Sequence, residues 1–269
     1  MLIISTTYGS RFEQVDKESI LDSAENAGVS FPYSCRDGRC SSCKCKVLSG
    51  ETACLSQELG LTDDQRLQGW ILSCVRTAKT NITLEVEDLG GLPLIKPKTL
   101  PCKIDSITQI SNDIIRVFLR LPPSIEVEYY AGQYVDLVVG NIRRSYSIAN
   151  APTKDNRLEF HIKKVERGLM SEYWFEKARM NDLLRIVGPH GTFFLRTVVG
   201  QDLVFLATGT GIAPVKAILE SLNDKPKNER PNSVTVYWGG RTLDALYWRL
   251  SESQYPARYE PVLSRPSAS

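Results

Sequence analysis

The sequence predicts an α+β protein of several domains, and three observations support this prediction. The chain has 269 residues, which is enough for two or three domains of ordinary size. Strand-like and helix-like patterns are mixed in the first part, short strands fill the middle, and a strand–glycine–helix unit opens the last part. Residues 87–101 hold two glycines and three prolines without an apolar period, as in an interdomain linker. We therefore divide the chain into residues 1–88, a linker 89–100, residues 101–197 and residues 198–269.

Composition excludes several classes of protein. The 33 basic and 31 acidic side chains leave a formal net charge of +2, so charge gives no reason to expect binding to nucleic acid or to an anionic membrane. No stretch approaches the roughly 18 apolar residues of a membrane span. The N-terminus has neither the basic start nor the long apolar core of a signal peptide. We therefore expect a cytoplasmic protein, and we expect it to be a monomer. Because 42% of its residues are hydrophobic, the chain can bury cores.

The first domain should combine strands with one short helix. Residues 1–7 and 11–15 have strand patterns on either side of a Tyr-Gly-Ser turn, which predicts a hairpin. Residues 19–28 predict a helix that Ser19 caps and Gly28 ends. Residues 45–51 and 81–87 alternate between apolar and polar side chains, as half-buried strands do.

Four cysteines in this domain have a spacing that indicates a metal cluster. Cys35, Cys40 and Cys43 follow the pattern Cys-x4-Cys-x2-Cys, and Cys74 comes after a longer gap. Disulfides are not expected in a reducing compartment, and a zinc ribbon needs two Cys-x2-Cys knuckles where this chain has one. The pattern is the plant-type spacing for a [2Fe–2S] cluster. We predict these four thiolates as the metal ligands.

The residues around the four ligands support the same interpretation. Gly38, Ser41 and Ser42 are small enough to let a loop wrap closely, with its N–H groups turned toward the sulfurs. We expect Cys45 to pack beside the site without being a ligand, and Cys54 and Cys102 to be ordinary buried thiols. The run "CRDGRCSSC" and the order of elements resemble the β-grasp fold of plant-type ferredoxins over about the first 88 residues.

The middle domain predicts a small antiparallel barrel. Its strand-like segments are residues 102–110, 114–121, 133–139, 143–150 and 157–165. The segment "RRSYSIAN" resembles the flavin-binding strand of the ferredoxin–NADP reductase superfamily. That resemblance implies that Arg144 pairs with the pyrophosphate of FAD, Tyr146 stacks on the isoalloxazine and Ser147 bonds near flavin N5, with Ser145 between them. An arginine fork suits a diphosphate, and an aromatic face suits a flat ring.

Further flavin contacts are implied by the segments that follow. "HIKKVERGLMS" resembles the next flavin element of the superfamily, and "GPHGTFFL" resembles the loop that closes the domain. The FAD-binding residues implied here are His161, Lys163, Gly168, Met170 and Ser171. The segment from Gly168 should begin a helix whose N-terminal amides can meet phosphate oxygens. We expect His190 to be structural, and we assign no residue to acid–base catalysis.

The last domain predicts α/β architecture with a nucleotide site. Residues 201–222 run from an apolar strand through "GTG" into a helix, and "GTGIAP" resembles the nicotinamide-nucleotide motif of the same superfamily. Residues 233–248 predict a second strand and another helix, and residues 259–266 predict a third strand. The NAD(P)-binding residues implied are Thr208, Gly209, Thr210, Gly211, Pro214, Gly239, Arg241, Ser264 and Arg265. The superfamily normally continues beyond this point, so we expect a partial nucleotide domain.

Together the three domains predict an electron-transfer enzyme that uses NADH or NADPH, FAD and a [2Fe–2S] cluster. Arg265 could hold the 2′-phosphate of NADPH, whereas the nearest resemblance implies NADH. That resemblance is to the CDP-6-deoxy-glucoseen reductases, through "RRSYSIANAP", "GPHGTFFLR" and "VYWGGR". It implies that the electron acceptor is a pyridoxamine-dependent deoxysugar 3-dehydrase. The alternatives are the reductase component of an aromatic-ring (Rieske-type) oxygenase and a truncated electron carrier without NAD(P)H activity.

Overall fold

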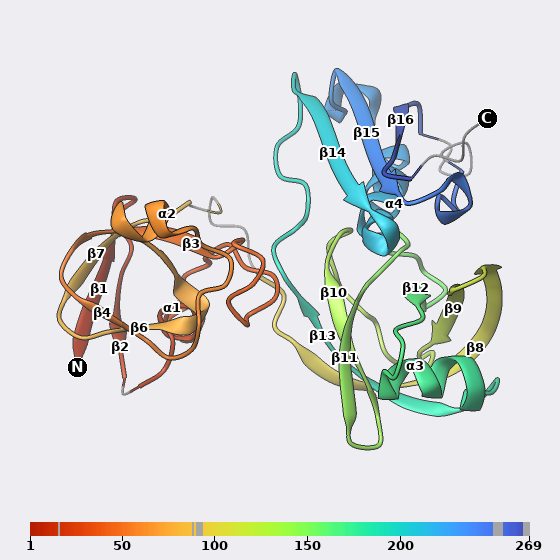
Figure 1. Cartoon of the computed structure of the whole chain (residues 1–269), viewed down its shortest axis with the longest axis horizontal. Coiled ribbons are helices and arrows are strands. Elements are labelled where there is room, and N and C mark those ends of the chain that lie inside the picture. The colour runs from red at the N-terminus through yellow and green to blue at the C-terminus, as the bar shows by residue number, and fades with distance from the viewer. Residues whose placement is uncertain (16, 88, 90–93, 250–254, 266–269) are drawn as a thin grey trace. The chain divides into compact units, whose positions relative to one another are not determined.

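A computed structural model describes residues 1–15, 17–87, 89, 94–249 and 255–265. The chain forms two compact units, Met1–Leu94 with Gly191–Phe193, and Ile95–His190 with Phe194–Ser269 (Figure 1). Part of the predicted linker, residues 90–93, lies outside the described residues. The last three residues of the predicted linker belong to a strand that begins at Lys98.

The first unit is built on a mixed sheet whose strand order is β2-β1-β7-β3-β5. Its strands are β1 (Leu2–Thr6), β2 (Arg11–Gln14), β3 (Lys44–Ser49), β5 (Trp70–Leu72) and β7 (Ile82–Glu85). β1 pairs antiparallel with β2 through the predicted hairpin and parallel with β7. A separate ribbon pairs β4 (Thr52–Cys54) with β6 (Arg76–Ala78).

Two helices and one tight turn complete this unit. Helix α1 (Ile20–Asn26) begins at Ser19, whose hydroxyl accepts a hydrogen bond from Asp22 N as an N-cap. Its residues Ile20, Leu21 and Ala24 are buried in a core with Phe31 and Leu84. Helix α2 (Asp63–Leu67) begins with a capping box formed by Thr62 and Gln65, and η1 (Ser73–Val75) is a 3₁₀ turn.

The second unit contains the predicted barrel, with strand order β11-β10-β13-β8-β9-β12 and antiparallel pairing throughout. The strands are β8 (Lys98–Ser111), β9 (Ile114–Arg120), β10 (Tyr134–Val139), β11 (Ile142–Ser147), β12 (Arg157–Lys163) and β13 (Leu183–His190). Contacts between β11 and β12 close the order. Helix α3 (Leu169–Glu172) continues into a π-helical turn, η2 (Tyr173–Lys177).

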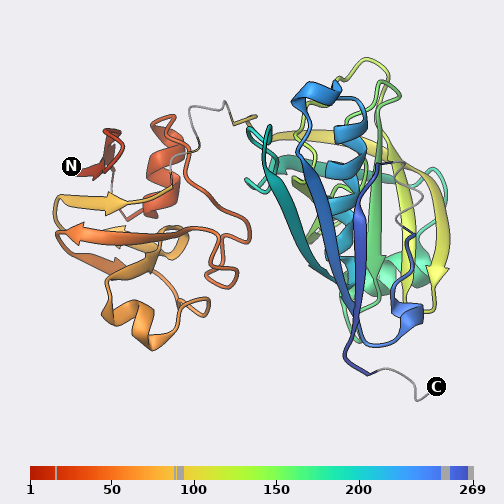
Figure 2. The ribbon, with the colours of Figure 1, turned by 90° about the horizontal axis from the view of Figure 1, so that it is seen from above.

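The same unit contains a three-stranded parallel sheet, β14-β15-β16, with strands Asp202–Thr208, Ser233–Gly240 and Arg258–Leu263. Helix α4 (Ile212–Asn223) follows the 3₁₀ turn η3 (Gly209–Gly211) and packs on this sheet (Figure 2). η4 (Lys227–Glu229) precedes β15. The second predicted helix, within residues 233–248, is wrong for the described residues, because that stretch holds only the 3₁₀ turn η5 (Leu243–Ala245) after β15.

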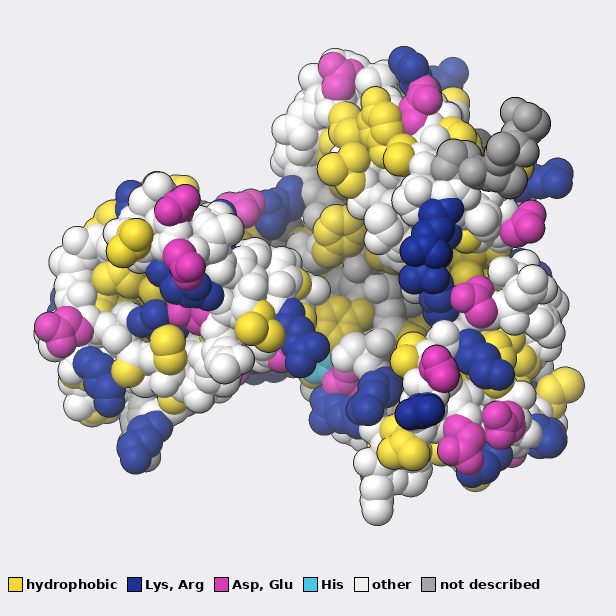
Figure 3. Space-filling view, in the orientation of Figure 1, with side chains coloured by type: hydrophobic (Ala, Val, Ile, Leu, Met, Phe, Trp, Pro, Cys, Tyr) yellow, Lys and Arg dark blue, Asp and Glu magenta, His cyan; other side chains and the backbone are white. Residues whose placement is uncertain are grey.

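The parallel sheet is apolar on both faces. Phe205, Val236 and Trp238 point into the core beneath α4. On the opposite face Val204 and Leu206 are 61% and 80% exposed, and hydrophobic side chains gather over β14 and β15 in Figure 3. Parallel sheets usually carry apolar residues on both faces in this way.

Candidate functional site: three predicted cofactor sites

The structure brings the four predicted metal ligands together as two pairs. Cys43 Sγ lies 3.2 Å from Cys74 Sγ. The Cys35 and Cys40 sulfurs each accept a hydrogen bond from the other residue's N–H, at 3.4 Å. The described residues hold no group of three ligands suited to a single metal ion. Two pairs of thiols are instead what a two-iron cluster requires, since each iron takes two protein sulfurs.

The loop that carries these cysteines turns its backbone toward the sulfurs. The N–H groups of Arg39 and Ser42 point at Cys35 and Cys40, respectively, and that of Gly38 points at Cys74. Such donors stabilise thiolate charge and tune a cluster. Gly38 has φ +78°, and a Cβ at this position would meet Gln57 O at 2.5 Å. The loop therefore needs glycine at this position for both conformation and space.

Arg36 links the same loop to helix α1 through ion pairs. Its guanidinium donates to both carboxylate oxygens of Glu25 at 3.0 Å and to Asp22 Oδ1 at 2.5 Å. The guanidinium also lies 4.7 Å from the centroid of the Tyr33 ring. A bidentate pair of this kind fixes orientation as well as distance. The helix therefore helps to define the position of the cysteine loop.

The three remaining cysteines differ in burial. Cys45 is fully buried in the core of the first unit, and burial raises the pKa of its thiol. Cys102 is buried within the barrel, as predicted. Cys54 is exposed, so the prediction that it is a buried thiol is wrong. It ends the short strand β4, which pairs with β6 in a two-stranded ribbon, and its side chain lies outside the core.

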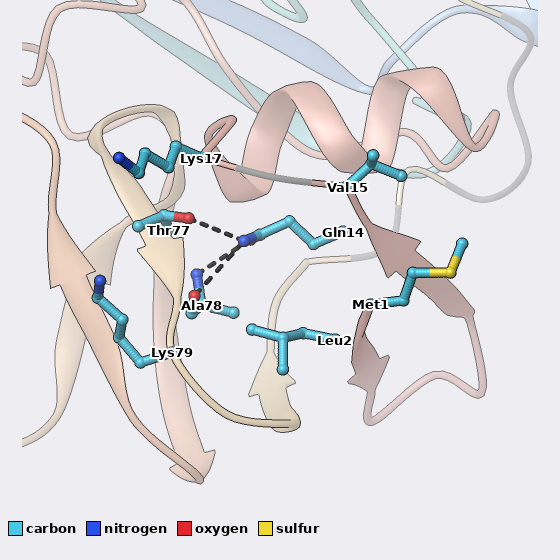
Figure 4. A pocket seen from close by; sticks show the side chains of 8 residues that line it. All are labelled: Met1, Leu2, Gln14, Val15, Lys17, Thr77, Ala78 and Lys79. Carbon is cyan, nitrogen blue, oxygen red and sulfur yellow. Dashed lines mark hydrogen bonds between the residues drawn. The ribbon is translucent and has the colours of Figure 1, made fainter.

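A cavity of about 340 Å³ lies elsewhere in the first unit (Figure 4). It is lined by Met1, Leu2, Gln14, Val15, Lys17, Thr77, Ala78 and Lys79. The buried Gln14 amide donates to Thr77 Oγ1 and accepts from Ala78 N, which fastens β2 to β6. No predicted ligand lines this cavity, so it is separate from the thiols.

The predicted FAD residues come from three segments that the barrel brings together, since β11 contacts both β12 and α3. On β11, the exposed Arg144 donates to Arg143 O and forms no ion pair with the described residues. Tyr146 is half-buried against the barrel, and burial raises its pKa to about 12. An unpaired guanidinium two residues from an aromatic ring on one strand fits a flavin diphosphate.

The neighbouring residues on β11 point to the buried carboxylate of Asp136 on β10. Arg143 forms an ion pair with Asp136 Oδ2 at 2.5 Å, and Ser145 Oγ donates to Asp136 Oδ1 at 2.5 Å. The hydroxyl of the exposed Ser145 is thus bonded to the neighbouring strand β10. Ser147 ends the strand, paired with Tyr134. Sequence reasoning missed Asp136, although an acidic residue in the middle of an apolar strand is a signal that a partner is needed.

The remaining predicted FAD residues are placed differently from one another. His161 is buried, with Nε2 2.9 Å from Glu159 Oε1 and Nδ1 3.0 Å from Tyr247 Oη. Lys163 is exposed near Asp113. Gly168 is the N-cap of α3, Ser171 Oγ accepts from Val165 N at 2.9 Å, and Met170 lies in the barrel core. His161 therefore belongs to a buried hydrogen-bond network and lines a cavity of about 290 Å³. Met170 packs in the barrel core, Lys163 is exposed, and Gly168 is the N-cap of α3.

The predicted nucleotide residues gather at the carboxyl ends of the three parallel strands. Thr208 ends β14 and pairs with Gly239 on β15. Ser264 N donates to Gly240 O, and Arg265 N donates to Arg241 O, so the two arginines follow adjacent strands. Ligands of open parallel sheets bind at this edge. Pro214 lies in the first turn of α4, where a missing N–H costs little.

The turn between β14 and α4 leaves room for a ligand. Gly209 has φ +51°, and a Cβ added at Gly209 or at Gly211 would find no atom within 4 Å. A side chain at either position would occupy that open space. Glycines in such a turn let a phosphate approach the backbone closely.

Comparison with protein families assigns a cofactor to each part. A 2Fe-2S iron-sulfur cluster binding domain matches residues 5–79, an oxidoreductase FAD-binding domain matches residues 101–195, and an oxidoreductase NAD-binding domain matches residues 205–266. A CDP-6-deoxy-L-threo-D-glycero-4-hexulose-3-dehydrase reductase from Yersinia pestis is 43% identical over 86% of this chain and 69% of its own length. The chain belongs to this family of iron–sulfur flavoprotein reductases.

Other relatives of this reductase serve oxygenases. The xylene/toluene monooxygenase electron transfer component of Pseudomonas putida is 30% identical over 97% of this chain and 75% of its own length. The crystal structure of an Amycolatopsis cytochrome P450 reductase superposes with a TM-score of 0.72 and 30% identity, covering 100% of this chain and 82% of that one. The predicted fold class, cofactors and type of enzyme are thereby confirmed.

The reductase is an NAD(P)H-dependent oxidoreductase that transfers electrons through FAD and a 2Fe–2S cluster. When bound, these groups supply hydride and single-electron chemistry, and the protein supplies orientation and electrostatics. No helix in the described ranges is both long and apolar enough to cross a membrane.

Sequence reasoning also missed a buried polar network in the reductase's second unit. Lys216 on α4, Glu159 on β12 and Glu220 on α4 are joined by contacts of 2.6–2.7 Å. A signal was present in the sequence, because Lys216 interrupts the apolar run "IAPVKAIL" and Glu220 follows it at i+4. The position of Glu159 depends on tertiary packing and leaves no local pattern.

Proposed function

We propose that this reductase delivers electrons to a CDP-deoxysugar 3-dehydrase. The observation that carries the proposal is the higher identity to the Yersinia dehydrase reductase than to the oxygenase components. In this proposal Cys35, Cys40, Cys43 and Cys74 hold the cluster, Arg144 and Tyr146 orient the flavin, and the turn Gly209–Gly211 receives the nucleotide.

The exposure of the cysteine loop supports a route for electrons to leave. Cys40 is exposed, and the neighbouring Arg39 and Asp37 side chains are 71% and 51% exposed. An electron-transfer partner must reach the loop that holds the cluster. A small exposed surface is enough for this, since weak redox complexes bury little surface. We infer that the acceptor protein docks over residues 36–42.

The test follows electrons to a defined acceptor under anaerobic conditions. The visible spectrum of the purified, cofactor-loaded chain is recorded before and after NADH or NADPH is added. The reduced chain is then mixed with a pyridoxamine-dependent CDP-sugar 3-dehydrase and its substrate. We expect the flavin and cluster bands to bleach with nucleotide and to recover when dehydrase and sugar are present.

The control variant is Cys74→Ser, which should retain flavin bleaching but lose transfer to the dehydrase.

A second candidate acceptor is an oxygenase component, because the relatives of this chain include reductases of that kind. Reoxidation at least about tenfold faster by an oxygenase component than by the dehydrase, a difference of about 1.4 kcal/mol in barrier, would reject the proposal in favour of this acceptor. Bands that respond to dithionite but to neither nucleotide would instead indicate an electron carrier.

A further inference from the structure

A buried lysine joins the predicted nucleotide and flavin sites. Lys216 lies on α4, five residues after the turn that ends at Gly211, and only 7% of its surface is exposed. Its Nζ donates to Ala149 O at 3.0 Å, to Glu159 Oε2 at 2.7 Å and to Glu220 Oε1 at 2.6 Å. The ammonium has three N–H groups, so all three donors are satisfied.

Two of these acceptors lie on or directly after the strands that carry predicted flavin residues. Ala149 follows β11 and lies two residues after Ser147, while Glu159 lies on β12. The two segments are bonded to each other, because Ala149 N donates to Glu159 O at 2.8 Å. Lys216 therefore bonds to both residues of the Ala149–Glu159 contact, which joins the end of β11 to β12.

A second contact from α4 strengthens the same connection. Glu220, one helical turn beyond Lys216, accepts from Ala151 N at 3.0 Å through its other carboxylate oxygen. Helix α4 thus holds the chain after β11 at two points, Ala149 and Ala151. We call this set of contacts, Lys216 and Glu220 to Ala149, Ala151 and Glu159, the α4 clamp.

The charged side chains of the α4 clamp are buried or partly buried, and they are hydrogen-bonded to one another and to neighbouring residues. Glu159 also contacts His161 Nε2 at 2.9 Å, and His161 contacts Tyr247 Oη at 3.0 Å. Burial would raise the pKa of Glu159, but the His161 hydrogen bond and the Lys216 charge outweigh it and lower the pKa. A buried, ionised and fully bonded pair is costly to separate, since separation leaves a charge without a partner.

We propose that Lys216 is a positioning residue for hydride transfer, which fixes the nicotinamide turn against the flavin strands. Hydride transfer breaks a C–H bond of the reduced nicotinamide and forms an N–H bond on the flavin, with both bonding electrons moving with the hydrogen. Its rate depends steeply on the distance and angle between the two rings, and a displacement of about 1 Å costs about 100-fold. This inference rests on the flavin and nucleotide positions given under the proposed function.

The test compares Lys216→Met with the intact chain, both loaded with FAD and cluster. Anaerobic stopped-flow measurements give the limiting rate of flavin reduction and the half-saturating NADH concentration. We expect the limiting rate to fall about 100-fold, while half-saturation changes less than about threefold. The matched control is Lys177→Met, which removes an exposed Lys–Glu pair of 2.7 Å and should change neither value.

A second measurement does not depend on turnover. Amide hydrogen exchange is followed in the FAD-loaded chain without nucleotide, over residues 147–151 and 209–213. We expect at least about tenfold faster exchange in Lys216→Met, because the clamp is open. If the intact chain is not reduced by nucleotide, the proposed function fails, and exchange still decides whether the clamp exists.

If Lys216→Met does not fold, the triple variant Lys216→Met, Glu159→Gln, Glu220→Gln replaces it, because it leaves no unpaired buried charge. A positioning role predicts that this variant binds FAD normally yet keeps the low limiting rate and the fast exchange. Wild-type rate and wild-type exchange in either folded variant would overturn the inference.

Discussion

Cys43 Sγ lies 3.2 Å from Cys74 Sγ, although 31 residues separate the two cysteines in the chain. Backbone pairing produces this proximity, because β3 runs antiparallel to β5 with Lys44 opposite Leu72. Ser73 then donates to Cys43 O through both its N–H and its hydroxyl, each at 3.1 Å. The pairing of β3 with β5 therefore brings these two thiols together.

Replacing Cys74 tests the ligand set. We expect Cys74→Ser to lose the visible bands of the [2Fe–2S] cluster and its two irons per chain, because one iron would keep a single protein sulfur. Cys45→Ser should keep the visible bands and both irons, since Cys45, two residues after Cys43, is buried in the core of the first unit. Visible absorbance, iron content and electron paramagnetic resonance after reduction with dithionite show whether each variant holds the cluster. Loss of the cluster in Cys45→Ser, or in Cys45→Ala, which adds no buried hydroxyl, would mean that the ligand set is wrong.

The spacing of the cysteines predicts this site because most of its proposed ligands are close together in the sequence. Three of the four lie within nine residues, Cys35 to Cys43. The α4 clamp could not be predicted in the same way. Glu159 and Lys216 are 57 residues apart, and their pairing exists only because α4 packs against β12.

Errors in the predicted elements have similar physical reasons. The segment around Leu243–Ala245 has apolar residues at helical spacing, but within the described residues it forms only a 3₁₀ turn. Its Leu246, Tyr247 and Trp248 pack against the core of the parallel sheet. Helix α2 was missed although "TDDQ" carries a capping-box signal, since five residues are too few for a clear period.

Gly38→Ala should destabilise the cysteine loop. Alanine at φ +78° costs about 1–2 kcal/mol, and the 2.5 Å contact with Gln57 O adds about 1–3 kcal/mol through forced displacement. Gly28→Ala is the matched control, because it has a similar φ of +75° but no atom within 4 Å of the added Cβ. Unfolding in urea is monitored through the loss of cluster absorbance. The free energy of unfolding should decrease clearly more in Gly38→Ala than in Gly28→Ala. Equal decreases would show that the space around Gly38 is unimportant.

Replacing the two adjacent arginines of β11 should affect two different properties, FAD affinity and stability. Arg144→Ala should weaken FAD binding by about 10- to 100-fold, the loss of a charge-assisted hydrogen bond of about 1.5–3 kcal/mol, with little change in stability. Arg143→Ala should instead destabilise the barrel, because it leaves the largely buried Asp136 without its 2.5 Å ion pair. Fluorescence titration of the flavin-free chain and thermal unfolding separate the two effects. Unchanged FAD affinity in Arg144→Ala would remove this residue from the predicted site.

Gly211→Ala tests the nucleotide turn without disturbing the fold. Gly211 has φ −61°, which alanine adopts readily, and a Cβ there meets no protein atom within 4 Å. The substitution should leave the free energy of unfolding unchanged or raise it by about 0.4–1 kcal/mol. The added methyl would nevertheless occupy the space where a pyrophosphate approaches the backbone, so the half-saturating concentration of NADH should rise at least about tenfold. Thermal unfolding and anaerobic flavin reduction measure the two quantities on the same sample. A normal half-saturation in this stable variant would place the nucleotide elsewhere on the sheet edge.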